Sequence, residues 1–227
     1  VSAPIGDFIG FAHALQDARI SMERLNDIHA QEDEEYDICN KLSLLPENGT
    51  ITVRDLTYSY SGAERDYAIK NLSLDIPEGK VTAIVGESGS GKTTLIKLLQ
   101  GFYKPNSGTI KVGGISLDCI NPHLWRKSTG SVMQESYIFS DTIAKNIALS
   151  TDEVDVKRLY DSALLANADE FISALPLGYN TRIGMEGSGV SQGQRQRLLI
   201  ARAIYKNPKY LFFDEATNSL DATNERI

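Results

Sequence analysis

The sequence predicts an α/β fold: a core with a mixed or parallel sheet, an antiparallel β-subdomain and an α-helical subdomain, all preceded by an N-terminal helix. Three observations predict it. A glycine-rich loop at residues 86–93 lies between a strand-like and a helix-like segment. Short runs with period-two alternation occupy residues 51–76. Residues 142–175 are dominated by Ala, Leu and charged residues, which are typical of helices. Strands that alternate with helices after an antiparallel-looking start favour an α/β core.

The first 30 residues carry a heptad-like apolar stripe. The pattern predicts one face of a long helix, either packed on its own domain or belonging to another bundle. The acidic run after it, Gln31–Glu35, predicts a linker, which we place at residues 31–48. Because residue 1 is Val and not Met, we expect the chain to be a piece of a longer polypeptide. The stripe consists of Phe8, Phe11, Leu15, Ala18, Met22 and Leu25.

Several short β-branched or alternating runs predict strands. Val81–Val85 is apolar and leads into the glycine-rich loop, as expected of a buried strand, and Leu211–Phe213 predicts a second buried strand after Asn207-Pro208. The loop is followed by a predicted helix from Thr94 to Leu99. The remaining predicted strands are Ile51–Val53, Leu56–Tyr60, Leu72–Ile76 and Thr109–Val112.

Composition narrows the function classes. The chain has 227 residues, 41% hydrophobic and 23% charged, enough for one large domain or one domain with an appendage. The net charge of −7 argues against a surface that coats nucleic acid, so we expect no nucleic-acid partner. No apolar run reaches the roughly 18 residues of a transmembrane helix. Cys39 and Cys119 have no metal-type spacing and predict buried or free thiols in a reducing compartment.

Residues 86–93 match the phosphate-binding pattern G-x-x-x-x-G-K-[ST] in full and predict a P-loop NTPase core. Glycines allow positive φ and a close approach of N–H groups to phosphate oxygens. Lys92 can reach the terminal phosphates, and the Thr93 hydroxyl can ligate Mg²⁺. A glycine-rich turn that precedes Lys by chance is the alternative, which the flanking segments disfavour. The predicted nucleotide-binding residues here are Gly86, Glu87, Ser88, Gly89, Ser90, Gly91, Lys92, Thr93 and Thr94.

Two later segments carry further chemistry. Tyr210–Phe213 ends in Asp214 and Glu215: Asp214 can complete the magnesium shell, and Glu215 is then free to polarise a water for attack on the γ-phosphate. Ser191 is a good N-cap for a helix, and a capped helix start with Gly193 is a second anion-binding device. Taken alone, that segment is better explained as an ordinary N-capped amphipathic helix.

Together these segments resemble ATP-binding cassette (ABC) proteins over residues 49–227. Gly86–Thr93, Val190–Gln194 and Tyr210–Glu215 are similar, in the family's order, to its Walker A, signature and Walker B elements. The resemblance implies ATP and Mg²⁺ as cofactors, a helical subdomain at about 136–205, and an ATPase domain truncated at its C-terminus. It also implies that Ser191, Gln192, Gly193 and Gln194 contact ATP in trans.

The resemblance assigns roles to further residues. Tyr60 resembles the aromatic residue that stacks on adenine. Without the resemblance, an aromatic residue of a core strand is an equally good interpretation of Tyr60. Gln134 resembles the Q-loop glutamine, which implies a contact with Mg²⁺. The implied catalytic residues are Lys92, Gln134 and Glu215. Thr181–Gly187 is similar to a segment that marks exporters, and Asp221 to the D-loop aspartate.

The resemblance also implies partners and a location. The expected partners are a transmembrane domain of the same polypeptide and a second copy in a head-to-tail homodimer, with this domain on the cytoplasmic face of the inner membrane. Residues 1–30 resemble the cytoplasmic end of the last membrane helix of fused exporters. Among these, the sequence is most similar to bacterial peptide or bacteriocin exporters, with or without an N-terminal peptidase.

Two departures modify this expectation. The signature has Gln192 where Gly is usual, although Gly193 is retained. The family's switch histidine lies beyond the last residue, and His13, His29 and His123 are all too early to replace it. We therefore expect this chain to bind ATP but to hydrolyse it weakly. A soluble ABC ATPase acting on nucleic acid or ribosomes, and an ATP-gated module without hydrolysis, remain the alternatives.

Overall fold

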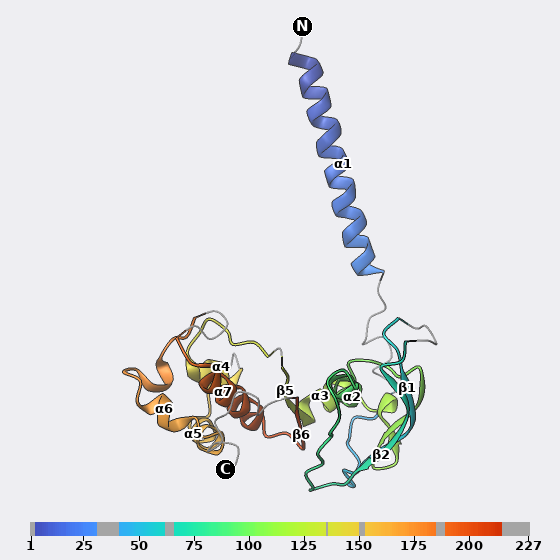
Figure 1. The fold of residues 1–227 in the computed structure, drawn as a ribbon. Coiled ribbons are helices and arrows are strands. Elements are labelled where there is room, and N and C mark those ends of the chain that lie inside the picture. Colours follow the sequence, from blue (N-terminus) through green and yellow to red (C-terminus); the bar gives the residue numbers. More distant parts are fainter. Residues whose placement is uncertain are drawn as a thin grey trace. The chain divides into compact units, whose positions relative to one another are not determined.

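The computed structural model describes residues 3–30, 41–61, 66–134, 136–149, 153–184 and 189–214. The chain divides into two units, Val1–Lys41 and Leu42–Ile227, and each is described by itself (Figure 1).

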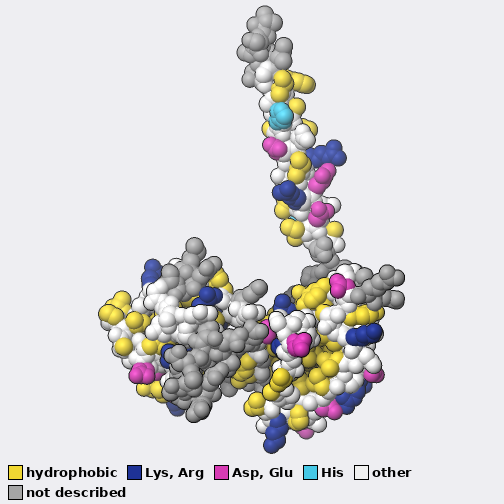
Figure 2. All heavy atoms as spheres, viewed as in Figure 1, with side chains coloured by type: hydrophobic (Ala, Val, Ile, Leu, Met, Phe, Trp, Pro, Cys, Tyr) yellow, Lys and Arg dark blue, Asp and Glu magenta, His cyan; other side chains and the backbone are white. Residues whose placement is uncertain are grey.

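The first unit contains the predicted N-terminal helix, α1 (Ala3–His29). All six residues of the apolar stripe are exposed, and Figure 2 shows hydrophobic side chains along this helix. On another face Arg19 forms an ion pair with Glu23 one turn later, at 2.9 Å. Within the described ranges, no helix combines the length and the apolar character needed to cross a membrane.

A four-stranded antiparallel sheet opens the second unit and confirms the predicted β-subdomain. Its order is β2-β1-β3-β4, and Ile51 of β1 lies opposite Ile76 of β2 and Val112 of β3. The predicted runs 51–53 and 56–60 fall on one strand, which continues through Asp55 at a register shift where φ is 50° and ends at Tyr58, so the last two predicted residues lie beyond it. The strands are β1 (Ile51–Tyr58), β2 (Ile69–Ile76), β3 (Ser107–Val112) and β4 (Ile115–Ser116).

Helix α2 (Lys92–Leu99) follows the glycine-rich loop and shares a hydrophobic cluster with this sheet. Leu98 and Leu99 are fully buried in the cluster, together with Val53 and Val112. The indole of Trp125 donates a hydrogen bond to the Leu99 carbonyl at 3.1 Å, which ties α3 (Pro122–Ser128) to the end of α2. A 3₁₀ turn, η2 (Leu117–Cys119), precedes α3. The helix that follows the glycine-rich loop is therefore packed firmly against the sheet.

Strands β5 (Thr129–Val132) and β6 (Tyr210–Phe213) pair in parallel, with Val132 opposite Phe213. The prediction that 211–213 is a buried strand is wrong for one of its faces. Leu211 and Phe213 are each 44% exposed, whereas Phe212 is buried. Side chains alternate between the two faces of a strand, and only the face with Phe212 packs on the sheet cluster.

The predicted buried strand Val81–Val85 is not formed, and this prediction is wrong. Val81 is 100% exposed and Val85 91% exposed, with no strand assigned between them. A strand requires a hydrogen-bonded neighbour. In the part of the chain that the structure describes, the parallel strands β5 and β6 pair only with each other. Ile84 alone packs partly against the sheet cluster, and the segment reaches the loop without regular secondary structure.

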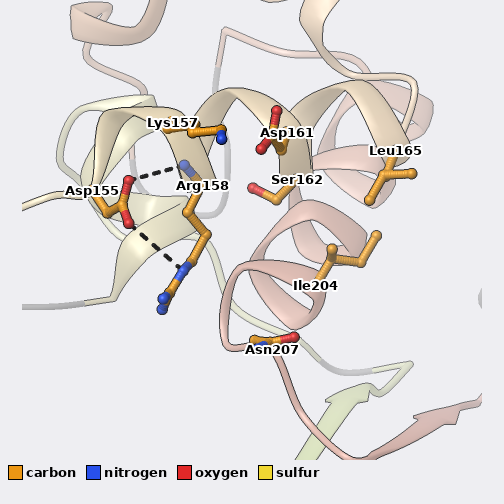
Figure 3. Close-up of a pocket in the computed structure, with 8 residues that line it drawn as sticks. All are labelled: Asp155, Lys157, Arg158, Asp161, Ser162, Leu165, Ile204 and Asn207. Atoms are coloured by element: carbon orange, nitrogen blue, oxygen red, sulfur yellow. Dashed lines mark hydrogen bonds and ion pairs between the residues drawn. The ribbon is translucent and has the colours of Figure 1, made fainter.

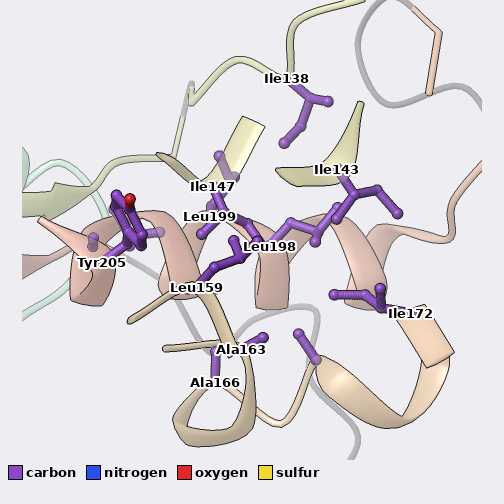
Figure 4. Close-up of a cluster of buried hydrophobic side chains, with 14 of the residues drawn as sticks. Ile138, Ile143, Ile147, Leu159, Ala163, Ala166, Ile172, Leu198, Leu199 and Tyr205 are labelled. Atoms are coloured by element: carbon purple, nitrogen blue, oxygen red, sulfur yellow. The ribbon is translucent and has the colours of Figure 1, made fainter. Parts of the chain in front are cut away.

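The prediction that residues 142–175 are helical is confirmed: they form short helices that pack on a longer one, α7. Figure 4 shows the apolar cluster that they share, with Leu198 and Leu199 of α7 facing Ile147 and Leu159. Thr142, Asp155 and Ser191 cap three of these helices with their side-chain oxygens. The elements are α4 (Ile143–Ala148), α5 (Val156–Leu165), α6 (Asp169–Ser173), η3 (Gly178–Asn180) and α7 (Gln192–Tyr205).

Candidate functional site

The phosphate-binding loop enters α2 through Gly91, the N-cap residue, whose φ is 89°. A Cβ at this position would lie 2.4 Å from the carbonyl oxygen of Ala68, so both the conformation and the space require glycine. Among the described residues, no side chain caps α2. The first-turn N–H groups of the helix are thus left without a capping oxygen, the arrangement that favours an anion.

Lys92 adds a positive charge inside this loop. Its ammonium donates hydrogen bonds to the carbonyl oxygens of Gly86 and Glu87, at 2.8 and 2.7 Å. The same Glu87 carbonyl accepts from the Ser90 N–H at 3.2 Å, which closes a turn. The cation is therefore held over the loop by two neutral backbone acceptors. Loop, helix start and ammonium together form a cradle that fits a polyphosphate.

The structure brings Tyr60 to this cradle. Its hydroxyl lies 3.0 Å from the hydroxyl of Thr94 in the first turn of α2. Tyr60 also contacts the rings of Tyr58 and Tyr103, with centroids 5.1 and 5.5 Å away. Tyr103 was not predicted as a site residue, because no spacing or motif in the sequence links it to Tyr60. Whether Tyr60 stacks on adenine stays a prediction.

Gln134 and Asp214 lie at the same edge of the β5–β6 pair, where both strands end. The Asp214 N–H donates to the Val132 carbonyl at 2.9 Å, and Gln134 is exposed in the turn that follows β5. Asp214 is only 4% exposed, and its Oδ2 has no hydrogen-bond partner among the residues that the structure describes. A buried carboxylate oxygen without a partner is costly, so it fits a cation such as Mg²⁺.

The predicted magnesium shell of Thr93, Gln134 and Asp214 stays a prediction. Gln134 and Asp214 share an edge, whereas Thr93 comes from α2, so that grouping of all three around one ion stays a prediction. Glu215, the predicted base, and Asp221 of the predicted D-loop lie outside the described residues.

The signature segment starts α7, and the prediction that Ser191 is its N-cap is confirmed. The Ser191 hydroxyl accepts from the Gln194 N–H at 3.2 Å, and the Gln194 side chain accepts from the Ser191 N–H at 2.9 Å. Gln194 is therefore committed to this capping box. Ser191 and Gln192 are exposed and Gly193 is half-buried. Their contact with ATP in trans stays a prediction.

Two arginines of α7 connect the signature helix to the chain that follows Gln134. Arg195 donates to the Ser136 carbonyl at 2.7 Å. Seven residues later, Arg202 donates to the carbonyls of Tyr137 and Asn146, at 2.6 and 2.8 Å. Burial lowers the pKa of Arg202 to about 10, which leaves it charged at neutral pH. Neither arginine was predicted as a site residue, although their spacing of seven residues places them on one face of the helix.

The segment that resembles an exporter marker is described up to Gly184. Its backbone pairs with the start of α4: the Ile143 N–H donates to the Thr181 carbonyl at 3.0 Å, and the Ile183 N–H to the Asp141 carbonyl at 3.1 Å. Residues 185–187 lie outside the described ranges.

A surface pocket of about 340 Å³ lies elsewhere, between α5 and the end of α7 (Figure 3). Asp155, which caps α5, pairs at 3.9 Å with Arg158 in the first turn of the same helix. None of the predicted site residues lines the pocket, so the pocket is separate from the phosphate-binding loop. Its lining consists of Asp155, Lys157, Arg158, Asp161, Ser162, Leu165, Ile204 and Asn207.

A protein-family profile described as "ABC transporter" matches residues 69–218. Two curated relatives match over the whole chain. They are the alpha-hemolysin translocation ATP-binding protein HlyB of Escherichia coli O6:H1 (strain CFT073), 40% identical, and the leukotoxin translocation ATP-binding protein LktB of Mannheimia haemolytica, 41% identical. The chain spans 32% of the length of each.

A solved structure of a bacterial Atm1-family ABC exporter with ATP bound is also similar. It superimposes with a TM-score of 0.84 at 34% identity, covering 93% of this chain and 36% of that one.

Proposed function

This chain belongs to the ABC transporter family as an ATP-binding domain, and we propose that it binds Mg²⁺·ATP at residues 86–94 and hydrolyses it to drive export of a polypeptide. One observation carries the proposal: α2 begins at an uncapped glycine, with the Lys92 ammonium held over the loop. Three fixed features of one loop, namely bare N–H groups, helix dipole and cation, favour the same polyanionic ligand.

The residues of the loop divide the work of binding. The N–H groups of the first turn of α2 receive phosphate oxygens, and Lys92 exchanges its two carbonyl partners for phosphate oxygens. Asp214 and Thr93 hold Mg²⁺, which when bound neutralises phosphate charge, with Gln134 at the same strand edge as Asp214. Glu215 accepts the proton of the attacking water. The adenine packs on Tyr60.

The proposed partners follow from the fused exporters to which the chain is similar. A transmembrane domain of the same polypeptide includes residues 1–30 as its last cytoplasmic turns, so this domain works on the cytoplasmic face of the inner membrane. A second copy binds head to tail, and its Ser191, Gln192 and Gly193 close over the ATP. The exposure of Ser191 and Gln192 supports that contact. Because HlyB and LktB are translocation proteins for hemolysin and leukotoxin, we propose a polypeptide cargo.

Titration calorimetry of the 227-residue chain with Mg²⁺·ATP tests the binding step. We expect saturable heat with one site per chain, and its loss or strong weakening in Lys92→Ala. Sedimentation with and without nucleotide then tests the ATP-dependent dimer. A chain that gives no heat with Mg²⁺·ATP would contradict the proposal at its first step.

A further inference from the structure

Three tyrosines form a cluster beside the phosphate-binding loop. Tyr58, at the end of β1, is 8% exposed and forms its base. The ring of Tyr103 stacks on Tyr58 with an interplanar angle of 29° and a centroid distance of 5.5 Å. Tyr60 meets both rings edge-on, at angles of 80° and 85°. Such edge-on contacts fix the orientation of a ring as well as its position.

Tyr60 has a third point of attachment at α2. Its hydroxyl is 3.0 Å from the hydroxyl of Thr94, in the first turn of the helix that follows the phosphate-binding loop. Tyr60 nevertheless remains 56% exposed, so part of its ring is open to a ligand. Base-binding surface and phosphate-binding loop are thereby joined through one side chain.

The chain around Tyr103 is anchored at both of its ends. At one end, Gly101 and Phe102 donate backbone hydrogen bonds to Leu98 and Lys97, which close the end of α2. At the other, the Asn106 side chain accepts from the Ser59 N–H at 2.7 Å, and the Asn106 N–H donates to the Thr57 carbonyl at 3.0 Å. Tyr103 therefore has a fixed backbone from which to support Tyr60.

From these contacts we infer that Tyr103 is a positioning residue for base recognition: it holds the Tyr60 ring beside α2, and thereby determines how strongly a nucleotide is preferred over its bare phosphate chain. The inference rests on the proposed binding of ATP. Tyr103 acts through Tyr60 and contributes nothing to phosphate binding. Its substitution therefore affects the adenosine-dependent part of the affinity only.

Inorganic tripolyphosphate separates the two parts, because it carries the phosphates of ATP without base or ribose. We expect Tyr103→Leu, which keeps apolar bulk but removes the ring, to weaken Mg²⁺·ATP binding by about two- to tenfold, the range for an aromatic pair. Its affinity for magnesium tripolyphosphate should equal that of the wild type. Tyr103→Phe keeps the ring and should restore ATP affinity. Phe102→Leu is the matched neighbour control, at a 58% exposed position.

A double-mutant cycle identifies the route. In a Tyr60→Ala background, Tyr103→Leu should cause no further loss of ATP affinity, because the ring that it supports is gone. A further loss would mean that Tyr103 contacts the base itself, and equal weakening of ATP and tripolyphosphate would mean a general structural role; either result overturns the inference. So does a Tyr103→Leu variant that binds ATP like the wild type. If the wild-type chain binds neither ligand, it is the proposed function that fails.

Discussion

Helices α2 and α7 both begin beside a glycine in a segment assigned to nucleotide binding, yet their first turns are built in opposite ways. At α2 the N-cap is Gly91, and no side chain accepts from the first-turn N–H groups. At α7 the N-cap is Ser191, and a reciprocal capping box with Gln194 satisfies two donors. One helix start therefore depends on a ligand for its missing acceptors, and the other is complete by itself.

The difference indicates that the starts of α2 and α7 have different roles in the proposed binding of a nucleotide. The start of α2, with Lys92 over it, has donors to spare and is suited to bind the phosphates first. The start of α7 exposes the side chains of Ser191 and Gln192 while its backbone is largely satisfied. It is suited to a second, weaker contact from another copy. The substitutions below test this contrast, in order of decreasing effect.

Gly91→Ala should have the largest effect. The added Cβ would meet the Ala68 carbonyl at 2.4 Å, and φ of 89° is strained for alanine. We expect the free energy of unfolding to fall by about 2 to 5 kcal/mol, combining left-handed strain with a steric clash. Gly89→Ala is the control: φ there is 81°, but a Cβ would meet nothing within 4 Å, so strain acts alone at about 1 to 2 kcal/mol. Urea denaturation measures both; equal losses would show that the contact with Ala68 is unimportant.

Lys92→Ala should abolish most of the ATP affinity and leave the fold intact. The charge-assisted hydrogen bonds to phosphate are worth about 1.5 to 3 kcal/mol, so the dissociation constant should rise roughly 10- to 150-fold. Lys97→Ala, in the last turn of the same helix, should change it less than about twofold, because the charge lies far from the loop. Calorimetry compares the two. A similar loss of ATP affinity in both variants would mean that Lys92 contributes only a general electrostatic attraction for the phosphates.

Asp214→Asn should raise the magnesium concentration needed for ATP binding, by an expected factor of about 10. The amide keeps the shape of the side chain but removes the charge from a position that is only 4% exposed. Since one oxygen of that carboxylate has no partner within the described ranges, the unliganded protein should become no less stable. ATP binding titrated with Mg²⁺ provides the measurement, with exposed Asp118→Asn as the control. An unchanged magnesium requirement would exclude Asp214 as a ligand.

What the sequence predicts well is local. The pattern of residues 86–93 specifies its own backbone chemistry, and the loop leads into α2 as expected, with Lys92 turned back over it. Ser191 and Gln194 form a capping box because this motif is defined by a spacing of three residues, which can be read directly from the sequence. The helical region and the antiparallel sheet follow from periodicity for the same reason.

The failures concern features that depend on distant residues. Val81–Val85 has strand composition, but a strand also needs a neighbour, and composition does not supply one. The exposed face of β6 was not predicted, because nothing in the composition of Tyr210–Phe213 shows which face of the strand packs against other residues. Tyr103 contacts Tyr60 across 43 residues, and Arg202 reaches Tyr137 across 65. No local pattern encodes such contacts, although they hold the candidate site in place.

Ser191→Ala should have the smallest effect and completes the contrast. Loss of the cap oxygen should lower the free energy of unfolding by about 1 kcal/mol, since the Gln194 N–H loses its acceptor. ATP binding to the isolated chain should be unchanged, because the start of α7 serves its own helix. Denaturation and calorimetry of one sample decide both points, and a marked loss of ATP affinity in the monomer would contradict the division between the two helices.

Ser191→Asp separates the cap from the proposed contact in trans. Aspartate is as good an N-cap as serine and favours the positive end of the helix, so stability should equal or exceed that of the wild type. Its negative charge would face the phosphates of a nucleotide bound by the other copy, and like charges repel. We therefore expect a stable chain that binds ATP but no longer dimerises with it in sedimentation. Undiminished dimerisation would mean that this helix start does not approach the partner's nucleotide.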